Sequence, residues 1–507
     1  MSLSVKSVSS YRLFIGLLLG YVLTHLLIRL AMGGTLELDE AEQLILGQQL
    51  AWGYNTQPPL YSWLQWSFFQ LFGEGVFALA LLKSLLLFGI YLFTWLTARS
   101  LIREPRIALL ATLSLFLIPS IAWESVRDLT HSVLATAIAA AMFYTVIRIY
   151  QQRALGGYLV LGVLLACGML AKYSFALFAL SLLLAAVSLP GYRRLLLDRR
   201  ILISAVLALL LVTPHLLWAL AYQHQISGFI ANQMGEAQQM DYLAGVISGL
   251  SSLTKSVVEF LILVWLVLTL LFPSAYRALP ADNVNIHRLL MARFLLAALL
   301  VCIVLIMVMG ATHFQSRWFQ PLLFIFPLYF LSRADAMGIT AQREMLLRSV
   351  IIFFAVTVIV LRFSQFWLAP YLQRHVNRMQ LPSAELAEQL KQQGFTGGTI
   401  IGDSNLSASN LALYFDNARI LSPKVEFFTV ASHLRSVVGQ CLITWHANRR
   451  DSMPETLTRF LRQQGIVVSA SKQDYISAPY RYTDRGEYRI GYILLGSELL
   501  CNRAQEN

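Results

Sequence analysis

Charged residues and cysteines are scarce in this sequence. Only 13% of its 507 residues are Asp, Glu, Lys or Arg, whereas 57% are hydrophobic, and the mean hydropathy is +0.61. Soluble globular proteins rarely combine so few charges with so much apolar surface. The four cysteines show no Cys-x-x-Cys pair and no metal-ligand spacing, and a disulfide between Cys441 and Cys501 would require an extracytoplasmic location. The composition indicates a membrane protein.

Long apolar windows recur along the first three quarters of the chain. A helix needs ~20 apolar residues to cross a bilayer, and several windows are at or just below that length. We count about eleven transmembrane helices. The first window is too long, and too poorly flanked by small residues, to be a cleaved signal peptide. We therefore expect an all-α polytopic membrane domain over residues 1–370, with helices in the windows 13–31, 76–98, 107–123, 132–147, 155–171, 173–190, 201–221, 257–272, 294–311, 318–331 and 349–368.

The net charge of +12 could suggest a nucleic-acid partner, but the distribution of the basic residues argues against it. They fall in alternate loops, as the positive-inside rule describes for membrane proteins. These loops are therefore expected to be cytoplasmic, with the N-terminus inside and the C-terminal region on the other side. This topology requires two short helices within 155–190 that turn at Ala-Lys-Tyr-Ser, residues 171–174.

Beyond Pro370 the composition changes. Charges of both signs become frequent, and helix-like segments such as 383–395 alternate with strand-like segments such as 398–403. This alternation predicts a small α/β domain over residues 371–507, on the extracytoplasmic side. The segment Gly-Asp-Ser-Asn at 402–405 resembles a lipase motif but lacks a downstream catalytic His and Asp, so we interpret it as a strand-to-helix turn.

Five unusual polar motifs sort to the outer face in this topology: residues 36–43, 123–132, 171–174, 222–229 and 311–318. Polar groups near membrane depth are costly unless they face a cavity or one another, so this clustering predicts a site at the outer membrane interface. Five solvated loops are the alternative. The carboxylates Asp39, Glu40, Glu124 and Asp128 could accept a proton from a hydroxyl group, and a phosphate could be neutralised by Arg127, His131, Lys172, His224, His313 and Arg317.

The same motifs, in the same order, resemble a known family. Residues 38–64, 127–132, 170–174, 213–229 and 316–330 are similar to the successive motifs of the bacterial dolichyl-phosphate-mannose-protein mannosyltransferase-like family, which are GT-C membrane glycosyltransferases. The resemblance covers roughly residues 10–330 and implies a GT-C fold. It also implies an inverting transfer from a sugar carried on a polyprenyl phosphate, a donor related to that of the lipid A aminoarabinose transferases.

The resemblance assigns roles to individual residues. Asp39 and Glu40 match the family's catalytic Asp-Glu pair, whose aspartate is regarded as the general base. Lys172 matches a Lys-Tyr position and is expected to bind the donor phosphate, with Arg127, His131 and Arg317 beside it. The expected substrate-binding residues are Asp128, Tyr54, Gln57, Tyr173, His224 and His313. Gln57 departs from the aminoarabinose transferases, which have a lysine at that position.

We therefore expect a multi-pass glycosyltransferase of the bacterial inner membrane, with its active site and C-terminal domain in the periplasm. Its acceptor could be lipid A, lipopolysaccharide, another glycolipid or a protein hydroxyl, and no nucleic-acid partner is expected. Asp128 and His131 could hold a divalent cation together with Asp39. The alternatives are a transporter or flippase for a lipid-linked sugar, which would carry polar groups along the membrane depth, and an inactive scaffold.

Overall fold

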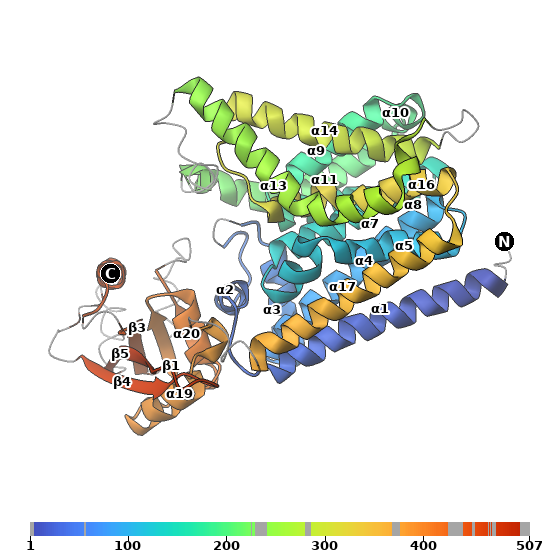
Figure 1. Cartoon of the computed structure of the whole chain (residues 1–507). Coiled ribbons are helices and arrows are strands. Elements are labelled where there is room, and N and C mark those ends of the chain that lie inside the picture. Colours follow the sequence, from blue (N-terminus) through green and yellow to red (C-terminus); the bar gives the residue numbers. More distant parts are fainter. Residues whose placement is uncertain are drawn as a thin grey trace. The chain divides into compact units, whose positions relative to one another are not determined.

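The structure is a computed structural model that describes residues 5–54, 57–224, 226–228, 241–278, 285–367, 376–423, 440–448, 452–464, 466, 468 and 473–496. Its internal contacts divide the chain into two compact units. The helical unit consists of Met1–His25, Thr56–Tyr61 and Lys83–Ile359. The sheet unit consists of Leu26–Asn55, Ser62–Leu82 and Val360–Asn507, so it draws on three separate stretches of the chain (Figure 1).

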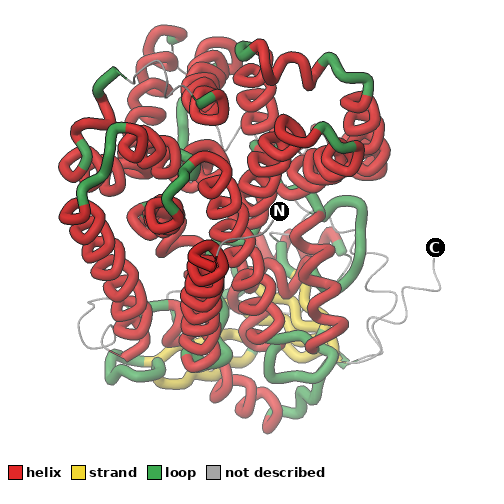
Figure 2. The backbone as a smooth tube through the Cα atoms, turned by 90° about the vertical axis from the view of Figure 1, so that its right-hand side faces the viewer, coloured by secondary structure: helices red, strands yellow, loops and turns green. Residues whose placement is uncertain are grey.

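Helices make up most of the described chain, and the strands gather in one place (Figure 2). Within the described residues, seven helices are long and apolar enough to cross a membrane. They are α1 (Val5–Ala31), α4 (Val76–Leu101), α7 (His131–Gln152), α11 (Arg200–Ala221), α13 (Tyr242–Leu271), α14 (Ile286–Met309) and α17 (Ala341–Trp367). The chain is therefore a multi-pass membrane protein, as the composition predicts.

Two further apolar windows form bent helix pairs, so up to nine spans are present in the described chain if each pair counts as one. In one pair, Pro105–Leu117, which begins with α5 (Pro105–Leu113), meets Ser120–Arg127, which ends with α6 (Ser125–Arg127), at a bend of 77°. In the other, α9 (Phe175–Val187) meets α10 (Pro190–Leu196) at a bend of 117°. Pro119 and Pro190 lie at these bends, where the missing N–H of proline prevents a continuous helix.

The two remaining windows are helical but shorter. One is α8 (Leu155–Ala171), and the other is divided between α15 (Gln320–Leu323) and α16 (Phe326–Ala336), each of which begins beside a proline. All eleven windows are helical, but against the expected eleven spans the described residues contain seven helices long and apolar enough to cross a membrane, or up to nine with the bent pairs. The predicted turn at residues 171–174 is confirmed, because α8 ends at Ala171 and α9 begins at Phe175.

The sheet unit contains a five-stranded sheet with the order β2-β1-β3-β5-β4. β1 is parallel to both β2 and β3, whereas β5 is antiparallel to β3 and β4. The strands are β1 (Gly398–Gly402), β2 (Arg419–Leu421), β3 (Gln440–His446), β4 (Asp474–Pro479) and β5 (Glu487–Leu495), and the helices beside them are α19 (Ser383–Gln392), α20 (Asn405–Ala412) and α22 (Glu455–Gln463).

The predicted C-terminal α/β fold is therefore confirmed. The turn at 402–405 joins β1 to α20, as expected from the sequence. The boundary predicted after Pro370 lies outside the described residues, and so does Cys501. Cys441, the other cysteine considered for a disulfide, is a free thiol buried in β3.

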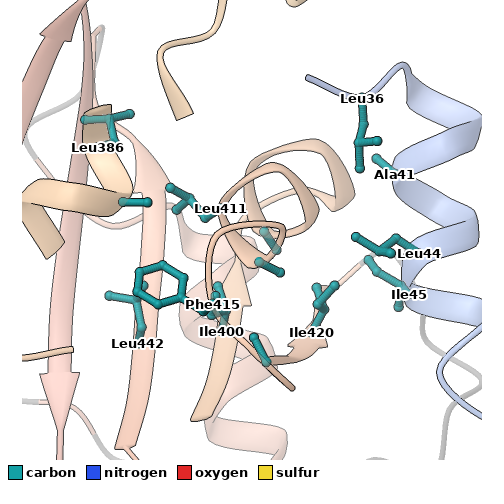
Figure 3. Packing of buried hydrophobic residues seen from close by; sticks show 14 of the residues in the cluster. Leu36, Ala41, Leu44, Ile45, Leu386, Ile400, Leu411, Phe415, Ile420 and Leu442 are labelled. Carbon is teal, nitrogen blue, oxygen red and sulfur yellow. The ribbon is translucent and has the colours of Figure 1, made fainter. Parts of the chain in front are cut away.

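Side chains alternate between the two faces of the sheet. Ile401, Ile443 and Trp445 pack against α22, and Ile400 and Leu442 belong to a second cluster on the other face. That second cluster contains residues of α19 and α20, and also residues of α2 (Leu38–Leu46), the helix that follows the first apolar window (Figure 3). The helix that carries the first acidic motif therefore contributes its apolar residues to the hydrophobic core of the sheet unit.

Candidate active site

The acidic residues of α2 divide by burial. Glu37 is the N-cap of α2 and forms a reciprocal capping box with Glu40, which satisfies two backbone N–H groups at the start of the helix. Glu37 is 6% exposed and Glu40 is 1% exposed, whereas Asp39 and Glu42 are partly exposed.

Both carboxylate oxygens of Glu40 are occupied. Oε1 accepts a hydrogen bond from Nε of Arg29 at 3.0 Å, and Oε2 accepts one from Nη2 of Arg29 at 2.7 Å. Oε2 also accepts from the backbone N–H of Glu37 at 3.1 Å. Arg29 in turn donates to the carbonyls of Gly33 and Thr35, at 3.1 and 2.8 Å. This network fixes the turn between α1 and α2.

Asp39 lies in the first turn of α2, where the helix dipole stabilises a negative charge. A helix turns by roughly 100° per residue, so Ala41, Leu44 and Ile45 lie about 140–240° around the axis from Asp39. These three side chains are buried in the core of the sheet unit. Asp39 therefore lies on a different side of α2 from these three side chains, whereas Leu46, which belongs to the same core, lies within about 20° of Asp39 around the axis.

Tyr54, predicted to bind substrate, is 1% exposed and belongs to the core of the sheet unit. Its hydroxyl donates to the carbonyl of Gln49 at 2.6 Å and accepts from the backbone N–H of Ala51 at 3.1 Å. Burial raises the pKa of Tyr54 to about 12, against the lowering effect of the hydrogen bond from Ala51. Tyr54 thus stabilises the loop after α2 through hydrogen bonds from a buried position. Gln57, by contrast, belongs to the helical unit and is partly exposed.

In the helical unit, the structure brings together two of the predicted motifs. Lys172 lies in the turn between α8 and α9, and its Nζ donates to the hydroxyl of Ser132 at 2.7 Å. His131 begins α7, and its Nδ1 hydrogen-bonds the carbonyl of Ala171 at 3.1 Å. Residues 171–172 and 131–132 therefore form one cluster, whose cationic group is the partly exposed Lys172.

Arg127 is the last residue of the bent helix pair, and Asp128 follows directly after it. The buried Nζ of Lys83, from α4, donates to the carbonyls of Arg127 and Asp128, at 3.4 and 3.5 Å. A positive charge at the end of a helix stabilises its free carbonyls, so Lys83 fixes this segment. Within the described chain, Nε of Arg127 is buried and has no hydrogen-bond partner.

A π-helical turn, Ser120–Glu124, precedes α6. The fully buried Gln320 donates through Nε2 to the carbonyl of Ser120 at 2.6 Å and to the hydroxyl of Ser125 at 2.9 Å. The hydroxyl of Ser120 donates to Oε2 of Glu124 at 2.8 Å. Such turns frequently occur at functional sites. No sequence motif predicts this network, although Pro119 marks the distortion of the helix.

The remaining predicted residues are distributed over the helical unit. The hydroxyl of Tyr173 hydrogen-bonds Nε2 of His215 at 3.2 Å, which satisfies that buried histidine. His224, His313 and Arg317 are exposed. Among the described residues, no group of three or more His, Cys, Asp or Glu side chains is arranged to hold a metal ion.

An apolar cavity of about 390 Å³ opens between α7, α8, α9, α10 and α11 in the helical unit. Its walls are almost entirely hydrocarbon and include Met142, Leu161, Leu165, Leu182 and Ala205. Its lining residues lie mostly in the C-terminal half of α7, the N-terminal half of α8 and the C-terminal half of α9, toward the ends opposite to those beside His131, Ser132 and Lys172. Because its walls are hydrocarbon, the cavity could accept a hydrocarbon chain.

The fold has solved counterparts. It is shared with ArnT from Cupriavidus metallidurans, a GT-C glycosyltransferase. The structure of ArnT bound to undecaprenyl phosphate matches with a TM-score of 0.57 and 12% identity, over 95% of this chain and 97% of ArnT. The structure of ArnT in the apo state matches with a TM-score of 0.60 and 12% identity, over 97% and 99% of the two chains.

Sequence similarity shows the family. The family model of dolichyl-phosphate-mannose-protein mannosyltransferase matches residues 56–218. The lipopolysaccharide core galacturonosyltransferase RgtB from Rhizobium johnstonii is 34% identical over 482 residues, which cover 94% of this chain and 96% of RgtB. RgtA from the same organism is 27% identical over 485 residues, with the same coverage of 94% and 96%.

The chain therefore belongs to the GT-C glycosyltransferase family that includes RgtA and RgtB. The resemblance drawn from its motifs is confirmed. The protein is a membrane glycosyltransferase that acts on cell-envelope acceptors.

Proposed function

We propose that this protein is an inverting glycosyltransferase that moves a galacturonosyl residue from a polyprenyl phosphate to the core of lipopolysaccharide. One observation carries the choice of sugar and acceptor: the 34% identity to the galacturonosyltransferase RgtB extends over 94% of the chain. The donor class is supported by the fold of ArnT, which has been solved with undecaprenyl phosphate bound.

Asp39 is proposed as the general base. It would take the proton of the acceptor hydroxyl while that oxygen attacks the anomeric carbon of the sugar. The bond from the anomeric carbon to the phosphate oxygen breaks, and polyprenyl phosphate leaves with the bonding electrons. The partial exposure of Asp39 and its place at a helix N-terminus support this role. Glu40, predicted as its catalytic partner, is assigned a positioning role, because both of its oxygens already accept hydrogen bonds.

Lys172 is proposed as the main ligand of the donor phosphate. A leaving phosphate gains negative charge, which a fixed cation stabilises strongly in a site of low dielectric. The hydrogen bond to Ser132 restricts the ammonium group of Lys172. Arg127 is proposed to bind a second anionic group of the donor, since a galacturonosyl phosphate also carries a carboxylate. His131, Asp128, Gln57, Tyr173, His224, His313 and Arg317 remain predictions for the substrate pocket.

The polyprenyl chain is proposed to enter the apolar cavity beside α7, α8 and α9. We place the protein in the bacterial inner membrane, with the N-terminus in the cytoplasm and both the reaction and the sheet domain in the periplasm. The alternating basic loops support this orientation.

The proposal is tested with purified protein in lipid nanodiscs, supplied with a polyprenyl-phosphate galacturonic acid and lipopolysaccharide. We expect the acceptor to gain one galacturonosyl residue by mass spectrometry, with the anomeric configuration inverted relative to the donor by NMR. A retained configuration would contradict the mechanism. Movement of the donor across a vesicle membrane without any transfer would instead support a flippase.

A further inference from the structure

The helix that carries Asp39 is too short to be stable alone. α2 has nine residues, and isolated helices below about 12–15 residues are marginal in water. Its stability and direction must therefore come from what it packs against. Ala41, Leu44 and Ile45 point toward Leu411 of α20 and Ile420 of β2 in the core of the sheet unit (Figure 3).

Two buried side chains of α20 hold the backbone of α2 on both sides of Asp39. Before the helix, the N–H of Leu36 donates to Oδ1 of Asn410 at 2.8 Å. Within the helix, the hydroxyl of Ser409 donates to the carbonyl of Ala41 at 2.7 Å. Asn410 is 1% exposed, and its Nδ2 donates to the carbonyl of Leu406 at 2.8 Å, which fixes its orientation.

The segment after α2 is held by the edge of the sheet. Gln48 accepts the N–H of Ile420 at 2.9 Å and donates to the carbonyl of Ile420 at 3.0 Å. Ile420 lies in β2, the edge strand, where backbone groups would otherwise lack a neighbouring strand. The side-chain amide of Gln48 thus supplies the donor and the acceptor that another strand would provide.

We propose that the C-terminal sheet domain positions the general base, with Ser409, Asn410 and Gln48 as positioning residues. The domain holds the face of α2 that carries Ala41, Leu44 and Ile45, and so fixes the direction from which Asp39 meets the acceptor hydroxyl. This inference rests on the proposed role of Asp39. It gives the sheet domain a part in the chemical step, in addition to any contact with substrate.

The inference is tested in the full-length protein with Ser409→Ala and Asn410→Ala. Ser407→Ala is the matched control, because Ser407 lies on the same helix but its hydroxyl donates to Asp403 at 2.7 Å within the sheet domain. Misplacing a catalytic group by about 1 Å can cost 10²-fold, so we expect kcat to fall about 10- to 100-fold in both test variants. We expect KM for donor and acceptor to stay close to those of the control, and the thermal midpoint to fall by no more than the loss of one buried hydrogen bond explains.

A merely structural role would lower the thermal midpoint without this selective loss of kcat. Hydrogen–deuterium exchange adds a direct readout: the Leu36 amide should exchange faster in Asn410→Ala than in the control. The inference is overturned if both variants keep the kcat of Ser407→Ala, or if kcat falls while exchange of residues 36–46 is unchanged.

Asp39→Asn, measured in the same assay, separates this inference from the proposed function. Full turnover in Asp39→Asn would show that Asp39 is not the general base, and the positioning of this residue would then have no catalytic purpose. Loss of turnover in Asp39→Asn, together with normal kcat in the Ser409 and Asn410 variants, would overturn the positioning role alone. If Asn410→Ala does not fold, Ser409→Ala decides, because it removes a single hydroxyl group.

Discussion

Arg29 and Glu40 form a buried, two-point ion pair. Nε contacts Oε1 at 3.0 Å and Nη2 contacts Oε2 at 2.7 Å, while the two residues are 4% and 1% exposed. Arg29 is in the last turn of α1 and Glu40 in the first turn of α2. The pair therefore fixes the short connection that places Asp39, the proposed general base.

Breaking this ion pair from one side should be severe. In Arg29→Met, the carboxylate of Glu40 stays buried without its partner, which typically costs about 3–5 kcal/mol. We expect a clear fall in the thermal midpoint, followed by the intrinsic tryptophan fluorescence of the detergent-solubilised protein. The double variant Arg29→Met with Glu40→Leu should recover most of the loss, because neither charge is then buried alone. A double variant as unstable as Arg29→Met would contradict the assignment.

Removing the cation at the turn between α8 and α9 should impair the chemical step. Loss of one group that stabilises developing negative charge typically lowers kcat by about 10²–10³. We expect Lys172→Met to show a loss of that size, and Lys172→Arg to retain part of the activity. Lys391→Met is the control, since Lys391 pairs with Glu388 on an exposed face of α19. Equal activity in Lys172→Met and this control would rule out the phosphate role.

Gln320 should matter for stability although it is not a proposed ligand. Its replacement by Leu leaves the carbonyl of Ser120 and the hydroxyl of Ser125 without their buried donor. An unsatisfied buried polar group costs about 1–3 kcal/mol. We expect a lower thermal midpoint than in Gln315→Leu, a partly exposed position in the preceding loop. The same midpoint in both variants would show that the π-helical turn does not depend on Gln320.

The thiol of Cys441 should be unreactive in the folded protein. Burial raises the pKa of Cys441 to about 12, so at pH 8 only ~10⁻⁴ of it would be thiolate, the reactive form. We expect negligible alkylation of Cys441 by iodoacetamide at pH 8, rapid alkylation after denaturation, and faster labelling as the pH rises toward 12. Mass spectrometry of the peptide that contains β3 measures this. Rapid labelling of the native protein would contradict the packing of the sheet.

Much of the fold follows from the sequence because its causes are local. Apolar windows give the helices, the alternating segments after Pro370 give an α/β domain, and Lys172 is correctly placed in a turn. The prolines explain why some windows bend. The family motifs also bring Lys172 and Ser132 together, as a common site would require.

Other features depend on contacts that no local pattern reveals. The apolar face of α2 shows that it must pack, but Leu44 and Ile45 give no sign that their partners lie some 360 residues later, in α20 and β2. Tyrosine has an apolar ring and a polar hydroxyl group, so the sequence around Tyr54 is equally compatible with a substrate-binding residue and with a buried core residue. From the sequence alone, a lysine such as Lys83 inside an apolar helix is unfavourable. The structure shows how it is stabilised, because its ammonium group donates to the carbonyls of Arg127 and Asp128.

The most direct test of the central claim is the turnover of Asp39→Asn with polyprenyl-phosphate galacturonic acid and lipopolysaccharide. Glu42→Gln is the matched control, because Glu42 is a second partly exposed carboxylate on the same helix. Loss of a general base typically costs 10²–10⁴-fold, so we expect kcat of Asp39→Asn to fall by about that factor while Glu42→Gln remains close to wild type. Turnover of Asp39→Asn equal to that of Glu42→Gln would contradict the account.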